Sequence, residues 1–128
     1  MEVLNSAISW FEIPVLDFPR AQKFYQAIFD TQIEEMQMGP FRMGMFPYDR
    51  DNNGVGGAIC HSEGYKPAGG DGVKVYLNGG DDLNTVLNRV AGAGGSIVMP
   101  KTEIAPGMGN MAFFNDTEGN VVGLFSMG

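Results

Sequence analysis

The residues best suited to chemistry lie in two short apolar segments, around residues 12 and 76. In the first segment, alternation places Glu12 on the same face as Trp10. In the second segment, Lys74 and Tyr76 share a face in the same way. A carboxylate and an ammonium held in a partly dry environment can pair, position a polar ligand or tune each other for acid–base catalysis. A salt bridge that only stabilises the fold is an equally good interpretation of such a pair.

Other side chains that could act as nucleophiles or metal ligands are few. His61 is the only histidine, so one copy of the chain cannot build a histidine-based triad or a multi-histidine metal cluster. Cys60, the only cysteine, lacks the sequence partners that would activate a thiol, and we interpret it as a small core residue. A single cysteine forms no internal disulfide, which agrees with a reducing, cytoplasmic location.

The composition is that of one globular domain. The chain has 128 residues, of which 44% are hydrophobic and 18% charged, enough for one substantial core. The net charge of −7, without a basic cluster, argues against a nucleic-acid partner. No apolar run approaches the ~18 residues of a membrane helix, and the amino terminus lacks a signal-peptide pattern, so we expect no membrane association.

The elements that position these residues repeat once along the chain. Residues 8–15 predict a buried strand, Asp17 predicts a helix cap, and an i, i+3, i+4, i+7 apolar stripe predicts the helix that follows. Residues 73–78, the pair Asp81-Asp82 and a second stripe repeat this order about 65 residues later. We therefore predict a duplication in which each half has the order βαβββ. The predicted single domain, 1–128, comprises module 1 (1–61), a linker (62–71) and module 2 (72–128).

The predicted strands at 32–38 and 41–46 carry a wall of methionines, namely Met36, Met38, Met43 and Met45. This wall either packs against the helices as ordinary core or lines a cleft with Met108 and Phe113. In a cleft it would favour a flat apolar or aromatic ligand near Trp10. The remaining predictions are a hairpin turn at 51–54, strands at 56–61, 96–99, 110–115 and 120–126, and a long loop at 100–109.

Three stretches resemble the signatures of the vicinal-oxygen-chelate superfamily, which is the glyoxalase, bleomycin-resistance and extradiol dioxygenase group. They are FEIPVLDFPRAQKFYQAIFD, VYLNGGDDLNTVLNRVAGAGGSI and NDTEGNVVGLFS, and the likeness covers nearly the whole chain. The resemblance implies an α+β fold of two tandem βαβββ modules that form a cupped mixed sheet with helices outside. It also implies that the strands carrying Glu12 and Lys74 approach each other, and that the protein forms a homodimer.

Enzymes of this family hold a divalent metal in the cleft through His, Glu or Gln side chains on the first and last strand of each module. Carried over onto this sequence, those positions fall on Trp10, Ala58, Lys74 and Gly123. An indole and an ammonium have no available lone pair, and alanine and glycine have no donor group. We therefore predict that the chain binds no metal and needs no cofactor.

Three functions are compatible with these residues and with the resemblance. The first is a metal-free protein that binds a small apolar or aromatic organic molecule. We predict that this ligand contacts Trp10, Glu12, Met43, Met45, Lys74, Tyr76, Met108 and Phe113. The second is an enzyme, either a metal-dependent lyase, isomerase or dioxygenase with non-standard ligands, or a metal-free acid–base catalyst that uses Glu12 and Tyr76. The third is a purely structural homodimer module.

Overall fold

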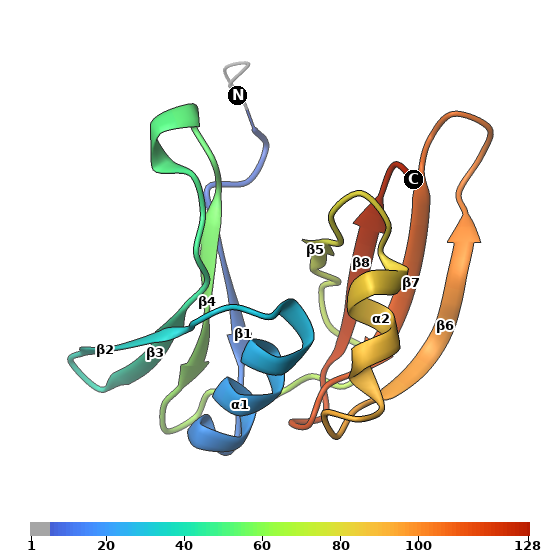
Figure 1. Ribbon diagram of the computed structural model, residues 1–128. Helices are drawn as coiled ribbons and strands as arrows, with labels where there is room; N and C mark the ends of the chain where they lie inside the picture. Colours follow the sequence, from blue (N-terminus) through green and yellow to red (C-terminus); the bar gives the residue numbers. More distant parts are fainter. Residues whose placement is uncertain (1–5) are drawn as a thin grey trace.

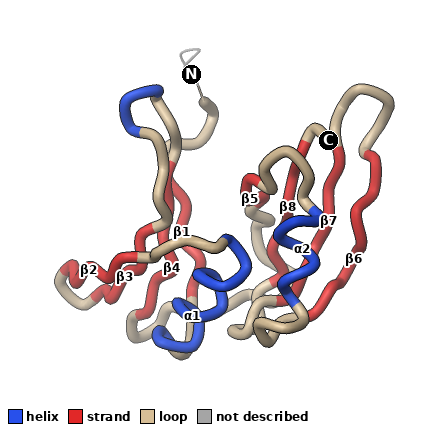
Figure 2. The backbone as a smooth tube through the Cα atoms, in the orientation of Figure 1, coloured by secondary structure: helices blue, strands red, loops and turns tan. Residues whose placement is uncertain are grey.

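The computed structural model describes residues 6–128, so the first five residues of predicted module 1 lie outside the described part. Two four-stranded sheets and two α-helices make up these residues (Figure 1). Figure 2 shows the same arrangement by secondary structure. In chain order the elements are β1 (Trp10–Pro14), α1 (Phe18–Phe29), β2 (Glu34–Met38), β3 (Phe41–Met45), the 3-10 helix η1 (Arg50–Asn52), β4 (Gly56–His61), β5 (Tyr76–Asn78), α2 (Asn84–Val90), β6 (Ser96–Glu103), β7 (Asn110–Asn115) and β8 (Val121–Ser126).

Both sheets have the same topology, which confirms the predicted duplication. The first has the strand order β1-β4-β3-β2 and the second the order β5-β8-β7-β6. In each sheet the first strand of the half runs parallel to the last strand, and the other neighbours are antiparallel. The parallel pairs place Glu12 beside Ala58 and Tyr76 beside Gly123. The predicted α+β fold of two βαβββ modules is therefore correct.

Helix α1 begins where the sequence predicts. The Asp17 carboxylate accepts a hydrogen bond from the backbone amide of Arg20 at 3.1 Å, and Pro19 lies in the first turn, where its missing N–H removes no helical bond. The predicted apolar stripe is buried, except for Phe29, which is half-buried. In α2 the predicted cap at Asp82 was wrong by one residue: Leu83 is the N-cap and makes no side-chain cap bond, while the Asp82 carboxylate before it accepts from the Asn84 amide at 2.9 Å.

The two helices lie between the two sheets (Figure 1) and contact each other. One core cluster contains residues of both helices and of the helix-facing side of both sheets, including Ile13, Phe24, Ile28, Ile59, Leu87, Phe114 and Leu124. Because both sheets use this side for the core, their helix-free faces point away from each other within one chain. Each helix-free face is therefore available to a ligand or a partner.

A polar clasp joins the start of α1 to the β7–β8 turn. We call it the Glu118 clasp: the Glu118 carboxylate accepts from the backbone amides of Leu16 at 2.9 Å and Asp17 at 2.7 Å, and from Arg20 Nε at 2.7 Å. Burial by itself would raise the pKa of Glu118, but these hydrogen bonds outweigh it and hold the pKa below its ordinary value of 4.5. The clasp thus ties a turn of the second half to a helix of the first.

Some predicted boundaries were wrong. The second-half strand predicted at 73–78 is shorter, because Val73 is 95% exposed and pairing begins only at Tyr76. The loop predicted at 100–109 is also shorter, because β6 continues to Glu103. Pro100 is tolerated there since β6 is an edge strand with two register shifts. The turn predicted at 51–54 contains the single 3-10 turn η1, followed by Asn53 in the left-handed region.

Candidate functional site

The methionine wall lies on the helix-free face of the first sheet. The strand register places Met43 beside both Met36 and Cys60, and it places Met45 beside Ala58. Ala58 in turn pairs with Glu12 on β1. All these side chains therefore share one face, and of the two interpretations of the wall, packing against the helices is wrong. The wall instead shares its face with Trp10 and Glu12, which lie across β4 from it.

Glu12 is held by two ring donors on this face, at the β1 edge of the sheet. Trp10 Nε1 donates a hydrogen bond to Glu12 Oε2 at 3.2 Å, and the Tyr65 hydroxyl donates to Glu12 Oε1. The hydrogen bond to Glu12, together with burial, raises the pKa of Tyr65 to about 12. We call Trp10, Glu12 and Tyr65 the Glu12 cluster. Its rings pack on a small buried group formed by Met43, Ala58 and Cys60.

Sequence analysis missed Tyr65, which completes this cluster. It belongs to the connection between β4 and β5, which was predicted as an irregular linker and has no strand or helix periodicity. Its ring lies against Phe41 of β3, with the ring centroids 5.8 Å apart. The only signal in the sequence was a lone aromatic residue among glycine, proline and charged residues.

Cys60 is buried beside the cluster, as predicted for a core residue, and His61 next to it is exposed. Burial and the nearby charge of Glu12 raise the pKa of the Cys60 thiol. A thiol with a raised pKa stays protonated near neutral pH and is a poor nucleophile. His61 Nδ1 lies 3.1 Å from the carbonyl oxygen of Val15, so the backbone fixes the ring at the strand end.

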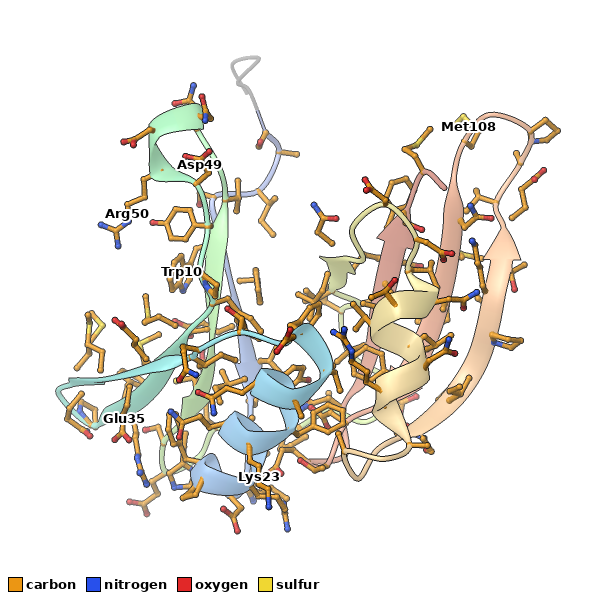
Figure 3. The ribbon with its side chains drawn as sticks, in the orientation of Figure 1. Trp10, Lys23, Glu35, Asp49, Arg50 and Met108 are labelled. Atoms are coloured by element: carbon orange, nitrogen blue, oxygen red, sulfur yellow. The ribbon has the colours of Figure 1, made fainter. Side chains whose placement is uncertain are left out.

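A second aromatic ring stands beside Trp10. The Tyr48 and Trp10 rings are 6.5 Å apart and inclined at 75°, an edge-to-face arrangement. The guanidinium of Arg50 lies over the Tyr48 ring, 5.4 Å from its centroid. Figure 3 shows Trp10 of β1 and Arg50 of η1 in the same half of the molecule, remote from Met108. Gly56 makes this stacking possible, because a Cβ atom at that position would overlap the Tyr48 ring.

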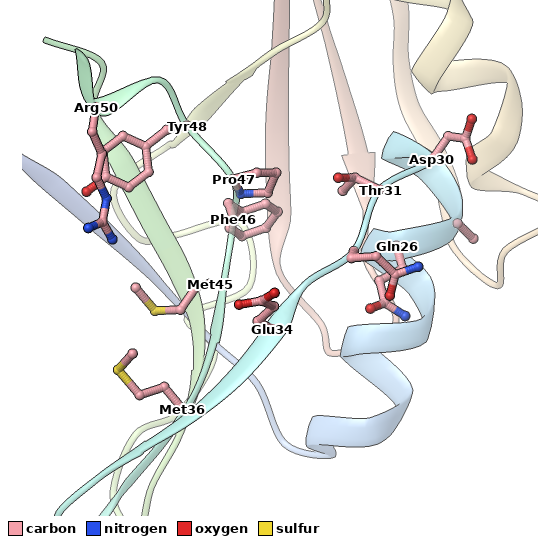
Figure 4. A pocket seen from close by; sticks show the side chains of 12 residues that line it. Gln26, Asp30, Thr31, Glu34, Met36, Met45, Phe46, Pro47, Tyr48 and Arg50 are labelled. Atoms are coloured by element: carbon pink, nitrogen blue, oxygen red, sulfur yellow. The ribbon is translucent and has the colours of Figure 1, made fainter. Parts of the chain in front are cut away.

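Two hollows flank these rings. The larger, of about 880 Å³, lies between α1 and the β2–β3 strands and is shown in Figure 4; its lining includes Gln26, Asp30, Glu34, Met36, Met45, Phe46, Tyr48 and Arg50. The smaller, of about 370 Å³, borders Trp10 and Glu12 and is walled by the β4–β5 connection at Lys66 and Val73. The smaller hollow thus borders Trp10 itself and the larger one borders its neighbour Tyr48, and each has room for a small organic molecule.

The other predicted site residues lie on the second half of the chain and form a separate group. Tyr76 and Phe113 stack on the second sheet with centroids 5.4 Å apart, and Met108 is exposed in the β6–β7 loop. Lys74 Nζ donates to the carbonyl oxygen of Gly70 at 2.5 Å. The predicted pairing of Glu12 with Lys74 is therefore not formed within one chain, because the Lys74 ammonium binds a backbone carbonyl and no ion pair of the described residues includes Glu12.

Comparison with known proteins decides the family. The model of the Glyoxalase/Bleomycin resistance protein/Dioxygenase superfamily matches residues 7–124. The chain belongs to this superfamily. Among its relatives in the superfamily, a glyoxylase-like domain-containing protein of Didymella fabae is 31% identical over 121 residues, which are 92% of this chain and 91% of that protein.

Two further similarities span most of the chain. CFP32 of Mycobacterium bovis, a glyoxylase by name, is 26% identical over 91% of this chain, but the chain spans only 44% of its length. The crystal structure of TnmS3, an antibiotic binding protein from Streptomyces sp. CB03234, has a TM-score of 0.68 and 22% identity, and covers 99% of this chain and 100% of that one. At that identity the likeness shows the fold alone.

The residues at the superfamily's metal positions do not fit a divalent cation. The resemblance carries these positions onto Trp10, Ala58, Lys74 and Gly123, none of which has a suitable donor. The strand register adds Glu12 beside Ala58 and Tyr76 beside Gly123, but these two oxygens lie on different sheets. Across residues 6–128, no group of three or more His, Cys, Asp or Glu side chains is arranged to hold a metal ion.

The described residues also bear on the membrane prediction. Within the part of the chain from residue 6 onward, neither helix is long and apolar enough to cross a membrane.

Proposed function

We propose that this superfamily member binds a small apolar or aromatic organic molecule, without a metal, on the helix-free face of its first sheet. The observation that carries the proposal is the Glu12 cluster, a carboxylate fixed by two ring donors within an apolar surface. Small-molecule sites combine such an apolar lining with a few oriented polar groups. Met43 and Met45 supply adaptable apolar contacts, and Trp10 supplies a ring for stacking. Membership of a superfamily named for bleomycin resistance proteins, and the fold shared with the antibiotic binding protein TnmS3, support this function.

We propose further that a second copy of the chain completes the cleft. Trp10, Glu12, Met43 and Met45 lie on one sheet, whereas Tyr76 and Phe113 lie on the other, whose helix-free face points away. Apolar residues remain exposed on both faces, with Met38 51% and Tyr76 47% exposed. A homodimer that places the second sheet of one copy against the first sheet of the other would bring the two groups together. A cytoplasmic location suits the free, buried Cys60.

Trp10 gives a direct test because it is the only tryptophan. Protein purified without chelator is analysed for metal content and titrated with aromatic and aldehyde compounds while tryptophan emission is recorded. We expect saturable changes that persist in EDTA, and a weaker affinity in Glu12→Gln with an unchanged melting temperature. Glu63→Gln is the matched control, since Glu63 is exposed. Stoichiometric nickel, zinc, iron or manganese would contradict the metal-free proposal.

The dimer is tested separately by light scattering during size-exclusion chromatography. The proposal predicts twice the chain mass of 13.8 kDa at micromolar concentration. Replacing Met38 with glutamate on the exposed face should shift the protein to the monomer mass. If the wild-type protein is a monomer and still binds ligand, the second copy is not needed for the site.

A second candidate function is metal-free acid–base catalysis. The close phenol–carboxylate contact between Tyr65 and Glu12 favours it, with Tyr65 in the role that the sequence assigned to Tyr76. Turnover of a bound compound that is lost in both Glu12→Gln and Tyr65→Phe would support this function. Activity that appears only when a divalent cation is added would instead support a metal-dependent lyase, isomerase or dioxygenase.

A further inference from the structure

A small apolar floor lies buried on the helix-free face of the first sheet. It consists of three residues that are each at most 5% exposed, namely Met43, Ala58 and Cys60. Three partly buried side chains pack against this floor, namely Trp10, Met45 and Tyr65. The first two belong to strands of the same sheet, whereas Tyr65 reaches the floor from the connection between β4 and β5. One ring from outside the sheet therefore fills a place on the face that we assign to the ligand.

The segment that carries Tyr65 has few bonds to the rest of the molecule. We call residues 62–74 the Tyr65 strap, and it contains no helix or strand. Its backbone bonds, donated by the amides of Tyr65 and Asp71, end within the strap, and so do the bonds of the Lys74 ammonium. Among the described residues, a single hydrogen bond leaves the strap, from the Tyr65 hydroxyl to Glu12. A segment with so few bonds opens at a low cost in free energy.

The contacts of Tyr65 define which chemical group this position recognises. The ring lies on the apolar floor and beside Phe41, with the ring centroids 5.8 Å apart. The hydroxyl donates to Glu12 Oε1, while Trp10 holds the other carboxylate oxygen. The position thus combines an apolar slot for a flat ring with one charged acceptor at the edge of that ring. A hydroxyaryl group has the matching shape and donor, and its bond to a carboxylate is stronger than a bond between neutral groups.

We propose that Tyr65 occupies the binding position of a hydroxyaryl ligand, which displaces the Tyr65 strap and places its own hydroxyl against Glu12. This inference rests on the proposed function and deepens it, since it names the chemical class of the ligand. The space for the ligand ring is the volume that the Tyr65 ring vacates. The hollow of about 370 Å³ borders the same carboxylate and the strap at Lys66, so it has room for the rest of a larger molecule. Because the strap competes from within the chain, it weakens every ligand that must displace it.

The single cysteine of the chain reports whether Tyr65 covers the floor, because Cys60 is part of that floor. Its rate of reaction with N-ethylmaleimide is measured in the full chain and divided by the rate in denaturant. Tyr65→Phe keeps the ring but loses the bond to the carboxylate, so it should react roughly 10-fold faster than the wild type. Tyr65→Ala should react faster still. Glu63→Gln is an exposed change within the strap and should leave the rate unchanged.

Two small compounds then test the ligand class in Tyr65→Ala. p-Cresol has the structure of the missing side chain, and toluene has the same ring without the hydroxyl. p-Cresol should protect Cys60 saturably and bind roughly 10-fold more tightly than toluene. Adding Glu12→Gln should reduce this preference to about three-fold, since the acceptor becomes neutral, whereas adding Glu63→Gln should not change it. The wild type should bind p-cresol at least roughly 10-fold more weakly than Tyr65→Ala, because Tyr65 competes.

The remaining outcomes separate this inference from the proposed function. Equal affinity for p-cresol and toluene would overturn the hydroxyaryl class and leave the proposed apolar site standing. Labelling of Cys60 that is no faster in Tyr65→Phe than in the wild type would show that the strap is not a displaceable cover. If Tyr65→Ala does not fold, the two compounds are compared in Tyr65→Phe, whose ring has no hydroxyl with which to compete. If no aromatic compound changes the tryptophan emission of the wild type, the proposed function itself fails.

Discussion

Replacing Glu118 with glutamine should destabilise the fold far more than its small change in shape suggests. The side chain is fully buried, and beyond the contacts of the clasp described above it accepts from Arg20 Nη2 at 3.0 Å and from the Thr117 hydroxyl at 2.8 Å. Glutamine has one acceptor oxygen, so the Arg20 Nε and Thr117 hydroxyl groups that bind Glu118 Oε2 would face an NH₂ group instead. Removing one partner of a buried ion pair costs roughly 3–5 kcal/mol. Because Arg20 is 49% exposed and regains water, we expect the lower limit, about 3 kcal/mol.

Thermal and urea denaturation followed by circular dichroism measure this loss. For a chain of this size, about 3 kcal/mol corresponds to a fall in melting temperature of roughly 10 °C. Glu63→Gln is the matched control and should stay within about 1 °C of the wild type, because exposed substitutions have small effects. If Glu118→Gln melts within about 2 °C of that control, the clasp does not stabilise the contact between the two halves and this reasoning is refuted.

Three further predictions concern pH and the site. The pKa of Glu118 is below 4.5 in the folded chain, so the ionised side chain contributes fully to the free energy of unfolding above about pH 4.5. This contribution is lost as the pH falls through the folded pKa, and acid denaturation should therefore depend less steeply on pH in Glu118→Gln. Ultraviolet titration should show one tyrosine ionising near pH 12, and Glu12→Gln should move the pKa of Tyr65 toward its ordinary value of 10.0; no movement would contradict their hydrogen bond. Gly56→Ala should displace the Tyr48 ring, change tryptophan emission and weaken ligand binding, whereas an unchanged emission spectrum would count against the stacked arrangement.

The sequence predicted the strand–helix unit of the first half well, because its signals are local. Asp17 caps α1 through its own side chain, and the buried stripe follows from helix periodicity. The end of the strand before residue 100 was predicted poorly, since proline usually interrupts pairing. Its place at the edge of the second sheet, which local sequence does not reveal, removes that penalty.

The candidate site was predictable only where it depended on strand alternation. Alternation placed Trp10 and Glu12 on one face, and the hydrogen bond between their side chains agrees with that placement. Tyr65 and Tyr48 were not predicted as site residues because they come from irregular segments. The path of such segments depends on the packing of the whole sheet rather than on periodicity. The Glu12–Lys74 pair failed for a related reason, since the relative orientation of the two sheets is set by the helices between them.

The same alternation explains how the chain keeps the fold of its superfamily while lacking suitable residues at the metal positions. Along β1, Ile13 packs into the core beneath the helices, whereas Trp10 and Glu12 lie on the opposite face. Substitutions on the helix-free face therefore leave the core that positions the strands intact. Trp10 and Ala58, onto which the family resemblance carries two of the metal positions, have no donor for a cation, whereas β1 presents the Glu12 carboxylate on the same face.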